Sequence, residues 1–377
     1  MSSRLSIICI WFCFITLLVL GMMMVASTGL CAIVKEDPML MLLKQCGFGF
    51  FGLVAALVIS TINYRKIRSW VWVMWVVCCV LLALCYVPGI GMELNGEQRW
   101  INLRVITFQP SEIAKICLMV SLADWYTTHR EMPGTFFRGL VYPGLIFGIP
   151  LVLILCERDM GTAAALGVSG LCVMYVAGVR HWLLFSVMLI GAVVMYDMAT
   201  SSDNRLDRIF AWLNPQAFSQ GAGRQQWISG LAFARGSYFG VGLGDGLEKF
   251  GNLPFAYTDF IFAEIGEEWG LVGTGGVLLL FTFLTLFGVM LALQTQDTFG
   301  RLLAVGLVCT IFWPAALNMA VVTGLLPNSG LPLPFISTGG TNLVFTILSI
   351  GILTSIQRHS SIAKQDYWPR RRLDSPA

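Results

Sequence analysis

Charged side chains are scarce in this chain. Asp, Glu, Lys and Arg make up 12% of its 377 residues, histidine occurs three times, and the formal net charge is +3. We expect no nucleic-acid partner and no organic cofactor. The eleven cysteines fall in or beside apolar stretches, and none joins histidine or acid at the spacing of a zinc site, so we interpret them as core residues.

Apolar residues dominate instead. They form 56% of the chain, the mean hydropathy is +0.76, and runs near the length that crosses a bilayer recur throughout. This pattern predicts an all-α polytopic membrane protein, a single domain over 1–377 with about ten transmembrane helices. The predicted spans are 5–34, 43–62, 70–88, 112–128, 140–156, 160–178, 181–199, 260–293, 302–325 and 340–357.

Basic residues in the short loops assign one side of the bundle to the cytoplasm. Both termini then lie inside. Within the cytoplasmic tail 358–377, the basic stretch Lys364–Arg372 is expected to contact lipid headgroups. Three longer segments, 89–111, 200–259 and 326–339, lie outside. The 200–259 loop, between predicted helices 7 and 8, is rich in glycine and aromatic residues, which favours a structured loop over a disordered one. The outside segments also carry basic residues that need an explanation: Arg99, Arg104, Arg205, Arg208, Arg224, Arg235 and Lys249.

Four carboxylates gather at the mouth of one predicted span. Asp259, Glu264, Glu267 and Glu268 fall within ten residues that hold no Lys or Arg, and 269–293 has no ionisable side chain. Acids at a membrane boundary are costly and are functional candidates by default. The alternative for Asp259 is a helix cap. Glu267 and Glu268 either pack between helices or tune Asp259, and we favour the second.

A second candidate lies where the fourth span begins. Pro110 and Ser111 suit a helix start, and Glu112 complements the positive end of its dipole. Lys115 lies one turn further in, three residues from Glu112, where an ion pair would be poorly solvated. This pair fits a structural and a functional role equally well.

Two further interruptions carry polar groups. Glu157-Arg158-Asp159 forms the short break between two spans, either as a charged hairpin tip or with the acids lining an outward cavity. The Pro- and Gly-rich crossing 327–340, which includes Ser337, cannot be helical, so it must be buried in protein or line a cavity.

Together these segments resemble the SEDS family (shape, elongation, division and sporulation proteins), the bacterial peptidoglycan polymerases. The resemblance covers essentially the whole chain, and the order and spacing of its motifs are specific. The motifs are Arg99-Trp100 with Gln109-Pro110-Ser111-Glu112 and Lys115; Glu157 to Thr162; Asn214-Pro215 followed by Gly240 to Gly244; and Thr258-Asp259-Phe260 with Gly266-Glu267-Glu268, closed by Pro332 to Gly340.

The resemblance implies a glycosyltransferase of the bacterial cytoplasmic (inner) membrane that polymerises lipid II on the outer face. Asp259 matches the catalytic aspartate, and would act as general base on an acceptor hydroxyl. Arg99 and Lys115, with a divalent cation (Mg or Mn) held by Glu157 or Asp159, would stabilise the diphosphate leaving group. A class B penicillin-binding transpeptidase and other division proteins are the implied partners. The residues expected to bind substrate are Arg99, Glu112, Lys115, Glu157, Asp159, Glu267, Glu268 and Ser337.

Alternatives stay open at this stage. Arg158 stands where the family often has proline, and its expected pairing with the neighbouring acids argues against a metal there. The stretch Glu264–Glu268 resembles the division branch (FtsW), whereas Leu331–Pro334 resembles the elongation branch (RodA). A lipid II flippase would also use buried acids and broken helices. A pure scaffold for a transpeptidase would tolerate a neutral residue at Asp259.

Overall fold

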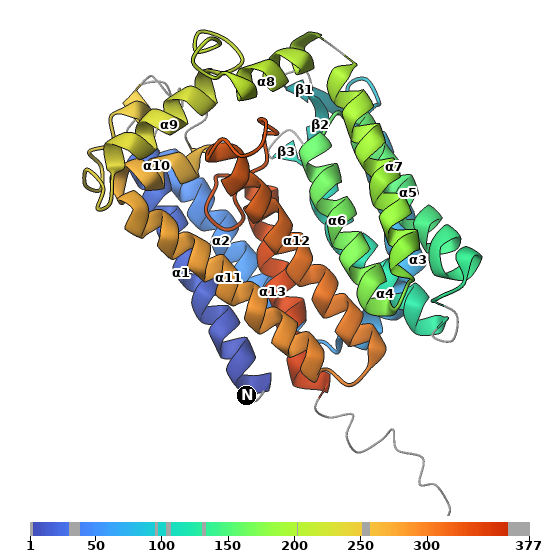
Figure 1. Cartoon of the computed structure of the whole chain (residues 1–377). Helices are drawn as coiled ribbons and strands as arrows, with labels where there is room; N and C mark the ends of the chain where they lie inside the picture. The colour runs from blue at the N-terminus through green and yellow to red at the C-terminus, as the bar shows by residue number, and fades with distance from the viewer. Residues whose placement is uncertain are drawn as a thin grey trace, which may run out of the picture.

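The computed structural model describes residues 3–29, 38–94, 97–102, 107–129, 133–201, 203–250 and 257–360. Long helices run side by side through the molecule, and a layer of shorter elements covers one end (Figure 1). The long helices are α1 (Ser3–Gly29), α2 (Pro38–Thr61), α3 (Val71–Leu84), α4 (Pro110–Thr128), α5 (Tyr142–Cys156), α6 (Met160–Ala177), α7 (His181–Thr200), α11 (Gly270–Gln294), α12 (Thr298–Val322) and α13 (Gly340–Ser360).

Nine helices in the described ranges are long and apolar enough to cross a membrane, and they match nine of the ten predicted spans. The tenth is α4, which contains Glu112, Lys115 and Asp124. α4 packs against α3, α5, α6, α12 and α13, so its polar groups face protein. A helix surrounded in this way does not need the lipid-facing apolar surface that hydropathy detects.

The predicted span 260–293 is two helices. The short α10 (Ile261–Glu268) ends at Glu268 with Trp269 as its C-cap, and α11 starts at Gly270, whose φ is +66°. The first amides of α11 bond to another segment, because Leu271 N–H and Val272 N–H donate to the carbonyls of Ser237 and Tyr238 at 2.9 and 3.1 Å. A Cβ at Gly270 would lie 2.4 Å from the Gly240 nitrogen, so this close approach requires glycine.

The expected all-α fold gains a small sheet. Strands β1 (Gly91–Leu94), β2 (Glu97–Asn102) and β3 (Thr107–Phe108) pair antiparallel in that order. Met92 lies opposite Trp100, and Ile101 lies opposite Phe108. The sheet holds Arg99 over the bundle end, which an irregular loop would not do.

The segment 200–259 is structured where it is described, as predicted. It forms α8 (Asp203–Leu213), α9 (Arg224–Gly236) and the 3₁₀ turn Glu248–Phe250. Figure 1 places α8, α9, α10 and the sheet at one end of the bundle, opposite the start of α1 and the end of α13. The two ends of the described chain therefore share a side, as the predicted topology requires.

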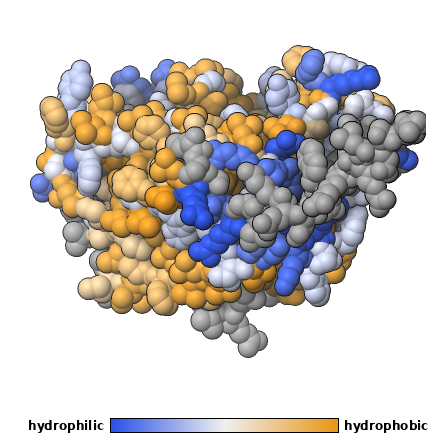
Figure 2. Space-filling view, turned by 90° about the horizontal axis from the view of Figure 1, so that it is seen from below, coloured by the Kyte–Doolittle hydropathy of each residue, from blue (hydrophilic) through white to orange (hydrophobic). Residues whose placement is uncertain are grey.

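The flanks of the bundle are apolar. Large side chains such as Phe12 on α1, Ile190 on α7 and Val272 on α11 are more than 60% exposed, as expected for residues that face lipid. Figure 2, which looks at the end where α1 begins, shows hydrophilic residues grouped toward the centre and hydrophobic ones over much of the rim.

Candidate active site

Asp259 lies in the turn that precedes α10, and it is not a helix cap. The residue before the first turn of α10 is Phe260, and no side chain caps this helix. The Asp259 carboxylate instead accepts a hydrogen bond from the Thr258 hydroxyl, 2.8 Å from Oδ1. The structural alternative considered for Asp259 is therefore wrong, and the side chain is available for chemistry.

The environment of Asp259 favours a proton acceptor. Burial raises the pKa of this carboxyl, because a charged group loses hydration there. The Thr258 hydrogen bond and the positive charges of Arg99 and Arg208 act in the opposite direction. Desolvation raises the pKa of Asp259 and two cations lower it. A carboxyl whose pKa is tuned by opposing effects of this kind is expected of a general base.

Arg99 and Asp159 meet at this end of the bundle. Arg99 Nη1 lies 3.3 Å from Asp159 Oδ2, and the Asp159 side chain is fully buried. Asp159 also caps α6, since Oδ1 accepts from Thr162 N–H at 3.0 Å and Oδ2 from the Thr162 hydroxyl at 2.8 Å. Gln109 Nε2 donates to Oδ2 at 3.3 Å. Asp159 thus fixes Arg99 relative to α4 and α6.

Glu157 is buried in the same turn, so the three-residue break is not simply a charged tip. Its carboxyl oxygens have no hydrogen-bond partner among the described residues. Burial and the nearby Asp159 raise the pKa of Glu157 to about 8. Arg158 adopts φ = +66° and is exposed, so the acids face inward and the arginine faces outward. Arg99, a residue of the sheet, forms an ion pair with Asp159.

These acids do not fit the expected divalent cation. No three His, Cys, Asp or Glu side chains in the described ranges are grouped so as to hold a metal. Asp159 already binds a guanidinium, and the raised pKa of Glu157 favours its neutral form.

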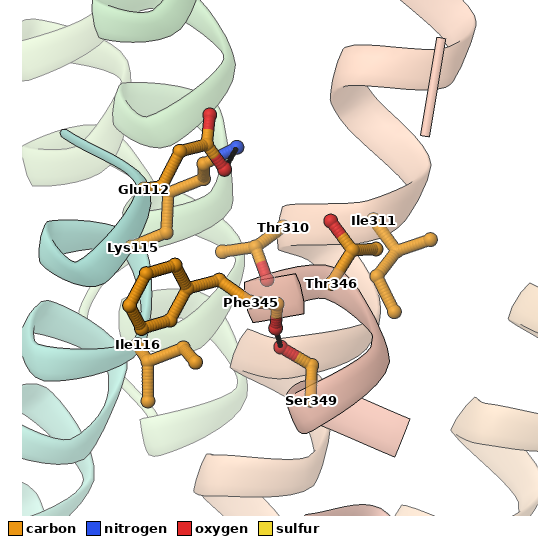
Figure 3. Close-up of a pocket in the computed structure, with 8 residues that line it drawn as sticks. All are labelled: Glu112, Lys115, Ile116, Thr310, Ile311, Phe345, Thr346 and Ser349. Carbon is orange, nitrogen blue, oxygen red and sulfur yellow. Dashed lines mark hydrogen bonds and ion pairs between the residues drawn. The ribbon is translucent and has the colours of Figure 1, made fainter. Parts of the chain in front are cut away.

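Glu112 and Lys115 line a pocket between α4, α12 and α13 (Figure 3). Lys115 Nζ lies 2.8 Å from Glu112 Oε2, and Asn342 Nδ2 donates to Oε1 at 3.3 Å. The Phe345 ring of this pocket meets the Phe108 ring of β3, with centroids 6.1 Å apart. The pocket therefore adjoins the sheet that carries Arg99. Its lining residues are Glu112, Lys115, Ile116, Thr310, Ile311, Phe345, Thr346 and Ser349.

Glu267 and Glu268 bind other elements in the described structure. Leu247 N–H and Glu248 N–H donate to the Glu267 carboxylate at 2.9 and 3.2 Å. Glu268 accepts from Lys249 Nζ, with both side chains fully buried, and from the Ser27 hydroxyl at 2.5 Å. These contacts join α10 to α1 and to the loop before it. Helix packing, the alternative we did not favour, describes them better than tuning of Asp259.

Ser337 contacts the backbone next to Asp259. Its hydroxyl donates to the Thr258 carbonyl and accepts from Leu333 N–H at 2.8 Å. The crossing 327–340 is thus packed in protein, as backbone without a regular helix requires. Substrate binding by Ser337, and by the other residues so assigned, remains a prediction.

Three residues of this region were not singled out from the sequence. The charge of Arg208 on α8 lowers the pKa of Asp259. Asn318 on α12 donates a hydrogen bond to the Asp259 carbonyl at 2.7 Å, and Lys249 forms an ion pair with Glu268. Arg208 and Lys249 were noted only as outside positive charge. Asn318 gave no signal, because an amide within an apolar run is often an ordinary packing residue.

The fold and the site define a class: a polytopic helical membrane protein with a partly buried carboxyl near cationic side chains at one end of its bundle. A family model for FtsW, RodA and SpoVE, described as "Cell cycle protein", matches residues 7–362. The chain belongs to this family.

Relatives of known sequence and solved structures support the same family. The chain is 37% identical over 338 residues to the probable peptidoglycan glycosyltransferase FtsW of Geobacter metallireducens, covering 89% of this chain and 90% of the relative. It is 35% identical over 347 residues to stage V sporulation protein E of Bacillus subtilis, covering 91% and 94%. A structure titled "Structural coordination of polymerization and crosslinking by a peptidoglycan synthase complex" matches with TM-score 0.78 and 25% identity, covering 93% of this chain and 97% of that one. Rod shape determining protein RodA of Thermus thermophilus shares the fold, with TM-score 0.69, 24% identity, and 93% and 95% coverage.

Proposed function

We propose that this protein is a peptidoglycan glycosyltransferase that polymerises lipid II during bacterial cell division. The observation that carries the proposal is the partly buried Asp259 carboxylate near the charges of Arg99 and Arg208. Relatives named FtsW favour the division branch over the elongation branch.

Asp259 acts as general base. It takes the proton from an acceptor sugar hydroxyl as that oxygen forms a bond to the anomeric carbon of the donor. The bond from this carbon to the lipid diphosphate breaks, and the diphosphate leaves with the electron pair. A positioned general base contributes about 10²- to 10⁴-fold to such a step.

The cationic side chains stabilise the leaving group. Arg99 and Arg208 place positive charge near Asp259, where the diphosphate gains negative charge as it leaves. Lys115 lines the pocket that adjoins the sheet, and we assign it to the same anionic substrate. The need to attract an anion also explains why basic residues gather at this end.

We place this end of the bundle outside the cytoplasmic membrane and both termini in the cytoplasm, following the short basic loops. A class B penicillin-binding transpeptidase is the proposed partner, because new glycan strands need crosslinking. The peptidoglycan synthase complex matched above, whose title names polymerization and crosslinking, supports this choice.

The test is polymerisation of purified lipid II by the purified protein, with and without the transpeptidase, alongside lipid II translocation in sealed vesicles. We expect glycan polymer and released undecaprenyl diphosphate. Translocation without polymer under every pairing would overturn the proposal in favour of a flippase. If the protein neither polymerises nor translocates lipid II, but the transpeptidase is active only in its presence, the protein is a scaffold.

A further inference from the structure

Three consecutive backbone carbonyls around Asp259 each accept a hydrogen bond from a distant part of the chain. The Tyr257 carbonyl accepts from Thr338, through N–H at 3.0 Å and the hydroxyl at 2.7 Å. The Thr258 carbonyl accepts from the Ser337 hydroxyl, and the Asp259 carbonyl accepts from Asn318 Nδ2 at 2.7 Å. The turn that carries the Asp259 carboxylate is therefore held by two other segments, α12 and the 327–340 crossing.

Asn318 connects these two supports. Its Nδ2 also donates to the Leu331 carbonyl at 2.6 Å, and the residue is 1% exposed. A side-chain amide presents two N–H groups from one nitrogen, so one residue can hold both carbonyls. In the protein interior, loss of this amide would leave two carbonyls without their donor.

Ser337 fixes the other side of the turn. Its hydroxyl bridges Leu333 N–H and the Thr258 carbonyl, and Gln45 Nε2 donates to the Ser337 carbonyl at 3.2 Å. Helix α1 supports the crossing from behind. A Cβ on Gly21 would lie 2.6 Å from Ile336 Cα and 2.7 Å from the Phe335 oxygen, so α1 leaves no room for the crossing to move toward it.

We infer that Asn318 and Ser337 are positioning residues that hold the Asp259 carboxylate in the geometry needed for proton transfer. This rests on the proposed function, because it gives Asp259 the role of base. The Thr258 hydroxyl engages Oδ1, so Oδ2 is the oxygen we assign to the transferred proton. A displacement of about 1 Å in such a group costs roughly 10²-fold in rate.

The chain contains a matched control. Gln226 on α9 is also a buried amide whose Nε2 donates to two carbonyls, those of Val321 at 3.1 Å and Leu326 at 2.7 Å. It binds the end of α12 and not the Asp259 turn. Asn318→Ala and Gln226→Ala therefore remove the same kind of interaction, and only the first reaches the proposed base.

The experiment measures kcat and KM for lipid II polymerisation, with the unfolding temperature of each variant. We expect Asn318→Ala and Ser337→Ala to lower kcat by about 10- to 100-fold with KM unchanged. Gln226→Ala should change kcat less than about twofold at a similar loss of unfolding temperature. Ser337→Thr keeps the hydroxyl and should recover part of the rate.

A second pair of variants avoids the buried amide. Gly21→Ala pushes against the 335–336 backbone, whereas a Cβ at Gly47 on α2 meets nothing within 4 Å. Gly21→Ala should lower kcat and Gly47→Ala should leave it unchanged. Equal kcat for both, or equal losses for Asn318→Ala and Gln226→Ala, would overturn the positioning role.

Failure of the proposed function gives a different result. In an Asp259→Asn background, the positioning role predicts that Asn318→Ala causes no further loss of rate. If Asp259→Asn itself retains full activity, the proposed base is wrong. If Asp259→Asn is inactive while Asn318→Ala behaves like Gln226→Ala, only the positioning role is wrong.

Discussion

The Arg99 guanidinium lies 3.3 Å from Asp159 Oδ2, joining strand β2 to the N-cap of α6. The pair brings together a residue of the small sheet and a residue of the bundle that are distant in sequence. The positive charge of Arg99 also lowers the pKa of Asp259. Arg99 therefore connects the turn that contains Glu157 and Asp159 to the proposed base.

Removal of one partner should destabilise the protein more than removal of both. Asp159→Asn keeps an oxygen for the Thr162 cap but removes the buried carboxylate that pairs with Arg99. In a double-mutant cycle with Arg99→Gln, we expect a coupling free energy of roughly 1 kcal/mol or more. The cycle is measured by denaturant unfolding in detergent, and additive effects would show that the pair is not coupled.

The acid side of the pH–rate profile should move when Arg208 is neutralised. The base must be deprotonated, so activity falls as pH drops through the raised pKa of Asp259. Arg208 opposes that rise, and Arg208→Gln should raise the pKa further and move the fall in kcat to higher pH. Arg180→Gln, at the opposite end of α6, is the control. An unmoved profile for Arg208→Gln would contradict the assigned electrostatics.

Glu157 should make stability depend on pH. Its folded-state pKa is about 8 against an ordinary 4.5, so the folded protein retains a proton that the unfolded chain releases. Its stabilising contribution is complete below about pH 4.5 and is lost as pH rises toward 8. Glu157→Gln should make this decline in unfolding temperature smaller, because other buried acids such as Asp259 keep their own raised pKa, whereas Asp245→Asn, at an exposed carboxyl, should leave the decline unchanged. If the unfolding temperature of Glu157→Gln fell with pH as steeply as that of the wild type, burial of Glu157 would not be a cause of the pH dependence.

The Lys249–Glu268 pair should be a strong structural contact. Both side chains are fully buried, so Lys249→Met leaves an uncompensated charge and should cost about 3–5 kcal/mol of unfolding free energy. Adding Glu268→Gln should recover much of this loss. Arg65→Met is the comparison, because Arg65 and Asp297 are paired near the surface. Loss of such a pair costs about 1 kcal/mol or less of unfolding free energy. Equal losses for both lysine and arginine variants would contradict the buried pairing.

Most of the fold was predictable because lipid-facing helices carry continuous apolar runs. The break at Gly270 was not, since it depends on contact with another segment. The sheet was missed, although the sequence contains a signal for it. The sequence Asn95-Gly96 between β1 and β2 was a usable hairpin signal. For Gly270, the reason for glycine becomes visible only when the Gly240 backbone is packed against it.

The site was predictable where charge is out of place. Asp259 stood out as an acid at a membrane boundary, and the structure removes the alternative of a cap. Asn318 did not stand out, because its partner lies 59 residues away in sequence. Glu267 and Glu268 were noticed correctly as unusual acids, but their partners lie on the preceding loop and, for Glu268, also on α1.

The most direct test of the central claim is the polymerisation rate of Asp259→Asn at saturating lipid II, measured together with its lipid II affinity. Asparagine keeps the size of the side chain and removes its ability to take a proton. If Asp259 is the base, turnover is lost by about 10²-fold or more while lipid II still binds. Wild-type turnover in this folded variant would contradict the claim.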